Sequence, residues 1–216
     1  MNLHELEITK DVRKPGVNWK TVFEKHGWKV LGQGIEATVG RKPGSPYVLK
    51  VYPQTSAYNS FLEFCAQHPS EHLPKFSRRA RNIPGTNPPM MYVRMEPLVD
   101  LTQNMLFAMY MPEIAYAWLE AEKQGMELNW GFHRLVLERL VKTFQIDVQN
   151  LLAEPETQKT LWREVGEPNE DWKRVVPALI AWMSQFPKHE LDLHSGNFMV
   201  RGRTLVIVDP FYEGKY

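Results

Sequence analysis

The chain has 216 residues, 43% of them hydrophobic, and its 26 Lys and Arg balance 25 Asp and Glu to a formal net charge of +1. A chain of this length can bury a substantial core, and so balanced a charge offers no global field for nucleic acid or a membrane surface. The single cysteine, Cys65, excludes an internal disulfide, and no apolar run of about 18 residues predicts a membrane span. We therefore expect a soluble, cytoplasmic protein without a membrane or nucleic-acid partner, and the sequence carries no signal for its oligomeric state.

The first predicted elements are two strands around a glycine-rich loop. The segment Leu31–Val39 reads L-G-Q-G-I-E-A-T-V, which matches GxGxxGxV with Ala37 in place of the third glycine. Glycines let a backbone close over phosphates without a Cβ clash, although two glycines between strands also make an ordinary tight hairpin. The loop alone is weak evidence for a nucleotide site. The cofactor-binding candidates it supplies are Gly32, Gly34, Ala37 and Val39.

The next predicted strand carries one lysine in an apolar context. Residues 47–52 read Y-V-L-K-V-Y, and Val48 and Lys50 are the cofactor-binding candidates of this run. In an ATP site, Lys50 would reach the α- and β-phosphates as a point charge. The alternative interpretation is an outward-pointing lysine on an edge strand.

A helix is predicted from Ser56 to about Gln67. Its Glu63 is the candidate carboxylate partner of Lys50, with Glu71 as the second choice. A solvent-facing Glu63 is the competing interpretation.

A strand at 90–95 then runs into a short proline-containing segment, which is typical of a hinge between two lobes. Pro97 lacks an N–H, so the carbonyl of Glu96 and the N–H of Leu98 are the candidate contacts to an adenine edge. We predict an N-terminal lobe over residues 1–97 and a helical C-terminal lobe over 98–216.

The middle of the chain reads as helical. Segments 111–123 and 131–152 carry Leu, Ala, Glu and Met at helical spacing. A third helix, with Asp171 as its predicted cap, has an apolar stripe that predicts core packing. That stripe comprises Trp172, Val175, Val176, Leu179, Ile180, Met183 and Phe186.

The clearest chemical signal lies near the C-terminus. Asp192 is followed by Asn197 five positions on, and Asp209 comes directly after the apolar run 205–208. Phosphoryl transfer from ATP needs a carboxylate that orients the attacking hydroxyl and takes its proton, together with oxygen ligands for Mg²⁺ on the triphosphate. Any one of these residues could belong to an ordinary β-turn. The two spacings together predict a kinase-type site that uses ATP and Mg²⁺, with Asp192, Lys50 and Asn197 catalytic and Asn197 and Asp209 binding the metal.

Three histidines near these motifs have weaker claims. His194 lies inside the Asp192–Asn197 loop, and we expect it to brace the loop through backbone hydrogen bonds. His68 and His72 have the i, i+4 spacing that can bind zinc on a helix. The intervening Pro69 and the lack of further ligands nearby predict a solvated loop instead.

The motifs together resemble the early serine/threonine protein kinases of autographivirus-type podophages, within the protein-kinase-like superfamily. The resemblance runs from the glycine loop to the C-terminus with a divergent middle. It is carried by Leu31–Val39, Val48–Val51, Ala57-Tyr58 with Phe61, Asp192–Asn197 and Val208-Asp209-Pro210. It implies an α+β, two-lobed fold with a small antiparallel N-lobe, one helix and a mainly helical C-lobe. It also implies an ATP- and Mg²⁺-dependent kinase that phosphorylates host proteins on Ser or Thr in the cytoplasm of an infected cell.

Two alternatives stay open. The string Asp-x-His-x-Gly-Asn also occurs in aminoglycoside and choline phosphotransferases, and seven residues after Asp209 leave no room for an extended activation segment. A small-molecule phosphotransferase with a helical insert at 101–170 is therefore the second hypothesis. A weakly active or inactive kinase-fold binding module is the third, although a pure scaffold would need none of Lys50, Asp192, Asn197 and Asp209.

Overall fold

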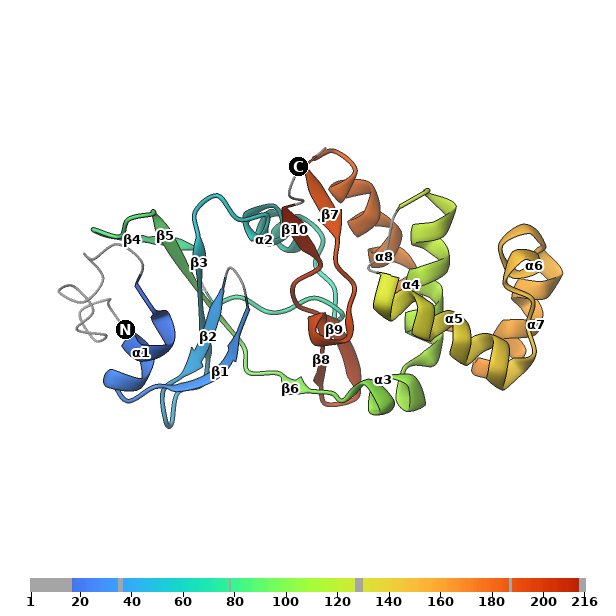
Figure 1. The fold of residues 1–216 in the computed structure, drawn as a ribbon, viewed down its shortest axis with the longest axis horizontal. Helices are drawn as coiled ribbons and strands as arrows, with labels where there is room; N and C mark the ends of the chain where they lie inside the picture. Colours follow the sequence, from blue (N-terminus) through green and yellow to red (C-terminus); the bar gives the residue numbers. More distant parts are fainter. Residues whose placement is uncertain (1–16, 35–36, 78, 127–129, 187, 214–216) are drawn as a thin grey trace. The chain divides into compact units, whose positions relative to one another are not determined.

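The computed structural model describes residues 17–34, 37–77, 79–126, 130–186 and 188–213 (Figure 1). Its contacts group the chain into two compact units. The first unit comprises the chain up to Asn59 together with Pro74–Pro97. The second unit comprises Ser60–Leu73 together with the chain from Leu98 onward. An antiparallel sheet in the first unit precedes a mainly helical region in the second. This arrangement confirms the predicted α+β class.

The first unit is built on a five-stranded antiparallel sheet with strand order β1-β2-β3-β5-β4. The strands β1 and β2 bracket the glycine loop, as predicted. The sequence did not predict the short edge strand β4. The bounds are β1 Lys29–Gln33, β2 Thr38–Arg41, β3 Val48–Pro53, β4 Arg81–Ile83 and β5 Met90–Met95.

One face of this sheet is covered by α1 (Trp19–Lys25), whose N-cap Asn18 accepts a hydrogen bond from the N–H of Thr21. The core on this side comprises Trp19, Val22, Phe23, Trp28, Leu49, Val51, Ile83, Met90 and Tyr92. Side chains alternate along a strand. Because Leu49 and Val51 face α1, Val48 and Lys50 lie on the opposite face of β3.

Helix α2 (Tyr58–Gln67) follows β3, with Tyr58, Phe61 and Phe64 buried along it. His68 stacks on Phe64 with ring centroids 4.4 Å apart. Cys65 is half-buried, and burial raises the pKa of its thiol well above the ordinary value. Since the thiolate is the reactive form, Cys65 is a core residue and a poor nucleophile.

The second unit contains α3 Gln103–Met109, α4 Met111–Lys123, α5 Trp130–Phe144, α6 Val148–Ala153, α7 Pro155–Val165 and α8 Glu170–Met183. The short helices α6 and α7 lie side by side (Figure 1). The prediction of one continuous helix over 131–152 was wrong. The structure has two helices there, α5 and α6, and Gln145 between them has φ 51°. A non-glycine residue in this left-handed region ends a helix because the following residue can no longer continue the right-handed path.

Helix α8 buries its predicted stripe from Trp172 to Met183, whereas Phe186, the last predicted member, lies beyond the end of the helix and is half-buried. The predicted cap was wrong. Asn169, two residues before Asp171, caps the helix by accepting a hydrogen bond from the N–H of Trp172 at 2.8 Å. Asp171 instead accepts a hydrogen bond from Ser70, as described below.

Short strands complete the second unit. The antiparallel sheet β6-β8-β9 joins Val99–Asp100, Phe198–Arg201 and Thr204–Ile207, and β7 (His189–Leu191) pairs with β10 (Phe211–Glu213). Within the part of the chain that the structure describes, no helix has the length and apolar character needed to cross a bilayer.

Candidate active site

The loop between β7 and β8 contains Asp192 and Asn197, and hydrogen bonds close it on itself. The side-chain Nδ2 of Asn197 donates to the backbone carbonyl of Asp192 at 2.6 Å. Residues 195–197 form one turn of 3₁₀ helix, in which the Asn197 N–H donates to the carbonyl of His194 at 2.9 Å. Asn197 is 7% exposed. The five-residue spacing between Asp192 and Asn197 is therefore the span of a closed loop with a buried amide.

Two backbone hydrogen bonds join this loop to the segment that carries Asp209. The N–H of Val208 donates to the carbonyl of Asn197 at 2.9 Å, and the N–H of Asp192 donates to the carbonyl of Pro210 at 2.7 Å. Asp209 lies between the two bonded residues of its segment. The structure thus brings Asp192, Asn197 and Asp209 into one backbone-bonded set.

His194 has the bracing contact that its position in the loop predicts. Its Nδ1 lies 2.9 Å from the backbone N–H of Gly196 and accepts that hydrogen bond. In neutral imidazole the proton is then on Nε2, which lies 3.4 Å from Asp192 Oδ2. A Cβ at position 196 would lie only 2.7 Å from His194 Cε1 and 3.1 Å from Nδ1. A larger residue at 196 would therefore displace the imidazole of His194 from its present position.

The chemistry of this set suits a bound Mg²⁺, which prefers oxygen ligands. Nδ2 of Asn197 is committed to the carbonyl of Asp192, so Oδ1 is the amide atom that could ligate a metal. Asp209, half-buried just after β9, would add a carboxylate. Asp192, also half-buried, offers a carboxylate that can accept a proton from an attacking hydroxyl.

In the first unit, Lys50 lies in the middle of the sheet. Register pairs it with Val39 on β2 and with Val93 on β5, while Val48 pairs with Met95. Its side chain is 5% exposed, and its Nζ lies 3.5 Å from the centroid of the Tyr58 ring. The interpretation of Lys50 as an outward-pointing edge residue is therefore wrong.

The glycine loop closes between β1 and β2. The N–H of Gly34 donates to the carbonyl of Ala37 at 2.8 Å, and Gly32 pairs with Val39. Ile35 and Glu36, at the tip of the predicted motif, lie outside the described residues. A Cβ on Gly32 would meet no atom of the described residues within 4 Å, so packing among these residues does not explain this glycine.

The candidate partners of Lys50 belong to the other unit. Glu63 is exposed on α2, and Glu71 Oε1 lies 3.8 Å from His72 Nε2. A pairing of either carboxylate with Lys50 stays a prediction.

The predicted hinge residues stand on the two sides of the division between the units. Glu96 is held in the first unit, where its N–H donates to the carbonyl of Lys75 at 3.0 Å and its Oε1 accepts the Lys75 N–H at 2.8 Å. Leu98 is half-buried, belongs to the second unit and directly precedes β6. Their contacts to adenine stay predictions.

Sequence reasoning missed the role of His72, which is 1% exposed. The predicted solvated loop was wrong here. Nδ1 lies 2.7 Å from the carbonyl of Leu205 on β9, and Nε2 lies 3.0 Å from Asn169 Oδ1 at the start of α8. The ring also packs edge-on against Trp172, with centroids 4.9 Å apart. Because both partners are distant in sequence, no local pattern could have predicted this burial.

The segment 69–73 around His72 is held along its whole length. Asp171 accepts hydrogen bonds from Ser70 Oγ at 2.6 Å and from the Glu71 N–H at 3.0 Å. The Arg201 guanidinium donates to the carbonyls of Glu71 and Leu73. We call this segment, Pro69–Leu73, the α2 anchor.

Two residues of the α2 anchor and one of α8 form a group of possible metal ligands. Glu71, His72 and Asp171 offer ligand atoms within 4.8 Å of one another. Both nitrogens of His72 have protein partners, and Asp171 accepts bonds from Ser70, Glu71 and Arg174. Desolvation raises the pKa of Asp171, but these hydrogen bonds and the Arg174 charge outweigh it and lower the pKa overall. We therefore interpret the group as a set of hydrogen bonds that connects the α2 anchor to the start of α8, and not as a metal site.

Comparisons with known proteins add one finding. No protein-family model matches the chain, and no curated protein matches it in sequence. Among solved structures, a streptomycin–ATP–APH(2")-IIa ternary complex aligns with 87% of this chain and 67% of that chain, at 13% identity and a TM-score of 0.33. A likeness this weak leaves the site to be judged on the chain's own geometry.

Proposed function

We propose that the chain is an ATP- and Mg²⁺-dependent phosphotransferase that transfers the γ-phosphoryl group to a hydroxyl. The observation that carries the proposal is the backbone-bonded set of Asp192, Asn197 and Asp209. A proton acceptor, an amide oxygen and a carboxylate are held by a hydrogen bond of 2.6 Å within the loop and by two of 2.7 and 2.9 Å between the loop and the segment that carries Asp209. Phosphoryl transfer depends on positioning and electrostatics more than on covalent chemistry, so rigid placement of these groups is what it requires.

Each residue has a distinct role in the proposed reaction. Asp192 accepts the proton of the acceptor hydroxyl and aims its oxygen in line with the γ-phosphate. Asn197, through Oδ1, and Asp209 hold Mg²⁺, which when bound neutralises charge on the phosphate oxygens. Lys50 anchors the α- and β-phosphates as a point charge. His194 keeps the loop in shape and faces Asp192 with its Nε2.

Nucleotide binding is assigned to the first unit and the hinge. The backbone of Gly32, Gly34 and Ala37 would approach the phosphates, and Gly32 fits this role because packing within the described residues does not call for a glycine there. Val39 and Val48 flank Lys50 in the sheet and supply apolar surface. The hinge contacts to adenine fall to Glu96 and Leu98.

For the acceptor we propose Ser and Thr hydroxyls of host proteins. This choice rests on the resemblance of the glycine loop, the Lys50 strand and the Asp192–Asp209 block to early phage serine/threonine kinases. The helices α3 to α7, which lie in sequence between Leu98 and the catalytic loop, favour a small-molecule alcohol as the second candidate. Such helices supply surface that could bind an acceptor.

A labelling experiment tests both candidates. The purified protein is incubated with γ-labelled ATP, Mg²⁺ and a bacterial lysate, and the label is followed in protein and in the metabolite fraction. Label on phosphoserine and phosphothreonine supports the protein kinase, and label in metabolites supports the small-molecule enzyme. Asp192→Asn is the control, and it should lower turnover by about 10²–10⁴-fold. Incorporation by Asp192→Asn at the wild-type rate, or none by the wild type, would refute the proposed function.

A further inference from the structure

Lys50 is held against an aromatic ring. Its Nζ lies 3.5 Å from the centroid of the Tyr58 ring, and the two residues are 5% and 1% exposed. A cation over the face of an aromatic ring is attracted by the ring's quadrupole, and the attraction grows when water is excluded. Both residues belong to the first unit, so this contact lies within one compact body.

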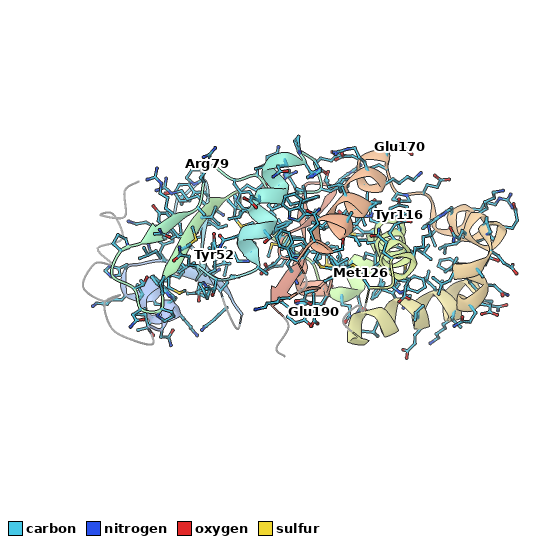
Figure 2. All side chains as sticks on the ribbon, turned by 90° about the horizontal axis from the view of Figure 1, so that it is seen from above. Tyr52, Arg79, Tyr116, Met126, Glu170 and Glu190 are labelled. Carbon is cyan, nitrogen blue, oxygen red and sulfur yellow. The ribbon has the colours of Figure 1, made fainter. Side chains whose placement is uncertain are left out.

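The Tyr58 ring is itself fixed from several sides. Tyr52 (labelled in Figure 2) packs edge-on against it, with centroids 5.0 Å apart and planes at 70°. The Tyr58 hydroxyl donates to Met95 Sδ at 4.0 Å, and its N–H donates to Ser56 Oγ at 3.2 Å. The Tyr52 hydroxyl in turn donates to Asn59 Oδ1 at 3.1 Å. Strands β3 and β5 and the first turn of α2 therefore set the position of the ring.

The ring restricts the flexible four-carbon side chain of Lys50 without adding a negative charge beside its ammonium group. Side-chain rotamer entropy that would otherwise be lost on binding phosphate is then already lost in the free protein.

We propose that Tyr58 is the positioning residue for Lys50, and that its ring holds the ammonium group where it meets the phosphates of ATP. The inference rests on the proposed function, in which Lys50 is the phosphate anchor. Tyr58 itself does not touch the nucleotide in this role. It acts through Lys50 and links the start of α2 to the nucleotide site.

The first test reads the contact without nucleotide. In protein labelled with ¹³Cε/¹⁵Nζ-lysine, the ring current of Tyr58 should shift the Lys50 Hε signals upfield, with Lys50→Arg used for assignment. Tyr58→Phe retains the ring and should retain the shift, whereas Tyr58→Leu should abolish it. The matched control is Tyr92→Leu, which removes a buried ring from the α1 side of the same sheet and should leave the Lys50 signals in place. Ordinary lysine shifts for Lys50 in the wild type would overturn the inference, even if Tyr58→Leu failed to fold.

The second test reads the consequence by calorimetry of Mg-ATP binding. Tyr58→Leu should weaken affinity by about tenfold, from the loss of a desolvated cation–π contact. Tyr58→Phe should recover most of that loss, and Tyr92→Leu should bind as the wild type does. Loss of the upfield shift in Tyr58→Leu with unchanged affinity would overturn the positioning role alone, provided that Lys50→Ala binds more weakly. If Lys50→Ala also bound ATP with wild-type affinity, the assignment of Lys50 as the phosphate-binding residue would be wrong, and the positioning role of Tyr58 would be refuted as well.

Discussion

Replacing His72 by leucine should destabilise the protein strongly, although no catalytic role is assigned to this residue. Leucine keeps most of the buried volume and removes both ring nitrogens. The two ring nitrogens face acceptors, the carbonyl of Leu205 and Asn169 Oδ1, and a neutral imidazole has one N–H to donate, so we count one hydrogen bond as lost, together with the edge-on contact with Trp172. The hydrogen bond contributes about 1 kcal/mol, and an aromatic pair adds about 1 kcal/mol beyond burial.

The expected loss in free energy of unfolding is therefore about 2 kcal/mol. For a chain of this size, such a loss lowers the melting temperature by about 4–8 °C. Urea and thermal unfolding followed by circular dichroism would measure it, with coincident far- and near-ultraviolet transitions as the test for two-state behaviour.

His68→Leu is the matched control for this variant. His68 lies four residues earlier, is half-buried and stacks on Phe64. Among the described residues the His68 ring has no hydrogen bond of the His72 kind to lose, and leucine keeps an apolar contact with Phe64, so His68→Leu should cost under about 1 kcal/mol. Equal stability of the two variants would refute the reasoning, since it would mean that the bonds to Leu205 and Asn169 contribute nothing net.

Three further predictions concern the site and the α2 anchor. Gly196→Ala would place a Cβ 2.7 Å from His194 Cε1, so we expect turnover to fall while Mg-ATP affinity stays unchanged, as steady-state kinetics and calorimetry would show. Asp209→Asn should make ATP binding nearly independent of Mg²⁺; titrations with and without EDTA would contradict the assignment if the variant kept the wild-type dependence. The pKa of Asp171 is lowered from 3.8 in the folded protein, so its stabilisation is present above pH 3.8 and is lost as pH falls through the folded pKa. The free energy of unfolding in urea should therefore change less between pH 6 and pH 3 in Asp171→Asn than in the wild type. An equal change in the two proteins would contradict the stabilising role of the Asp171 hydrogen bonds.

Features set by local sequence were predicted well. The strand around Lys50, the apolar stripe of α8 and the short loop from Asp192 to Asn197 each depend on residues close together in the chain. The two spacings near the C-terminus predicted that the backbones of Asp192, Asn197 and Asp209 lie close together, because a strand that ends at Ile207 has few ways to return to the loop before it.

Features set by distant partners were not predicted. His72 stands beside proline and polar residues, and its burial depends on acceptors 133 and 97 positions away. Tyr58 lies against Lys50 because of the path between β3 and α2, which periodicity does not specify. Asn169 and Asp171 are both good cap residues. The choice between them was decided by Ser70, which bonds to Asp171 from about a hundred residues away.

The two backbone hydrogen bonds on either side of Asp209 have a consequence for inhibition. In the proposed function Asp209 holds the metal, so a compound could inhibit the protein by binding a form in which Asp209 is displaced from its site. Here that motion would break the bonds from Val208 to Asn197 and from Asp192 to Pro210 together, and would also separate β7 from β10. Compounds that select a displaced aspartate should find little of that state to bind, and compounds that compete directly with ATP should be the effective class.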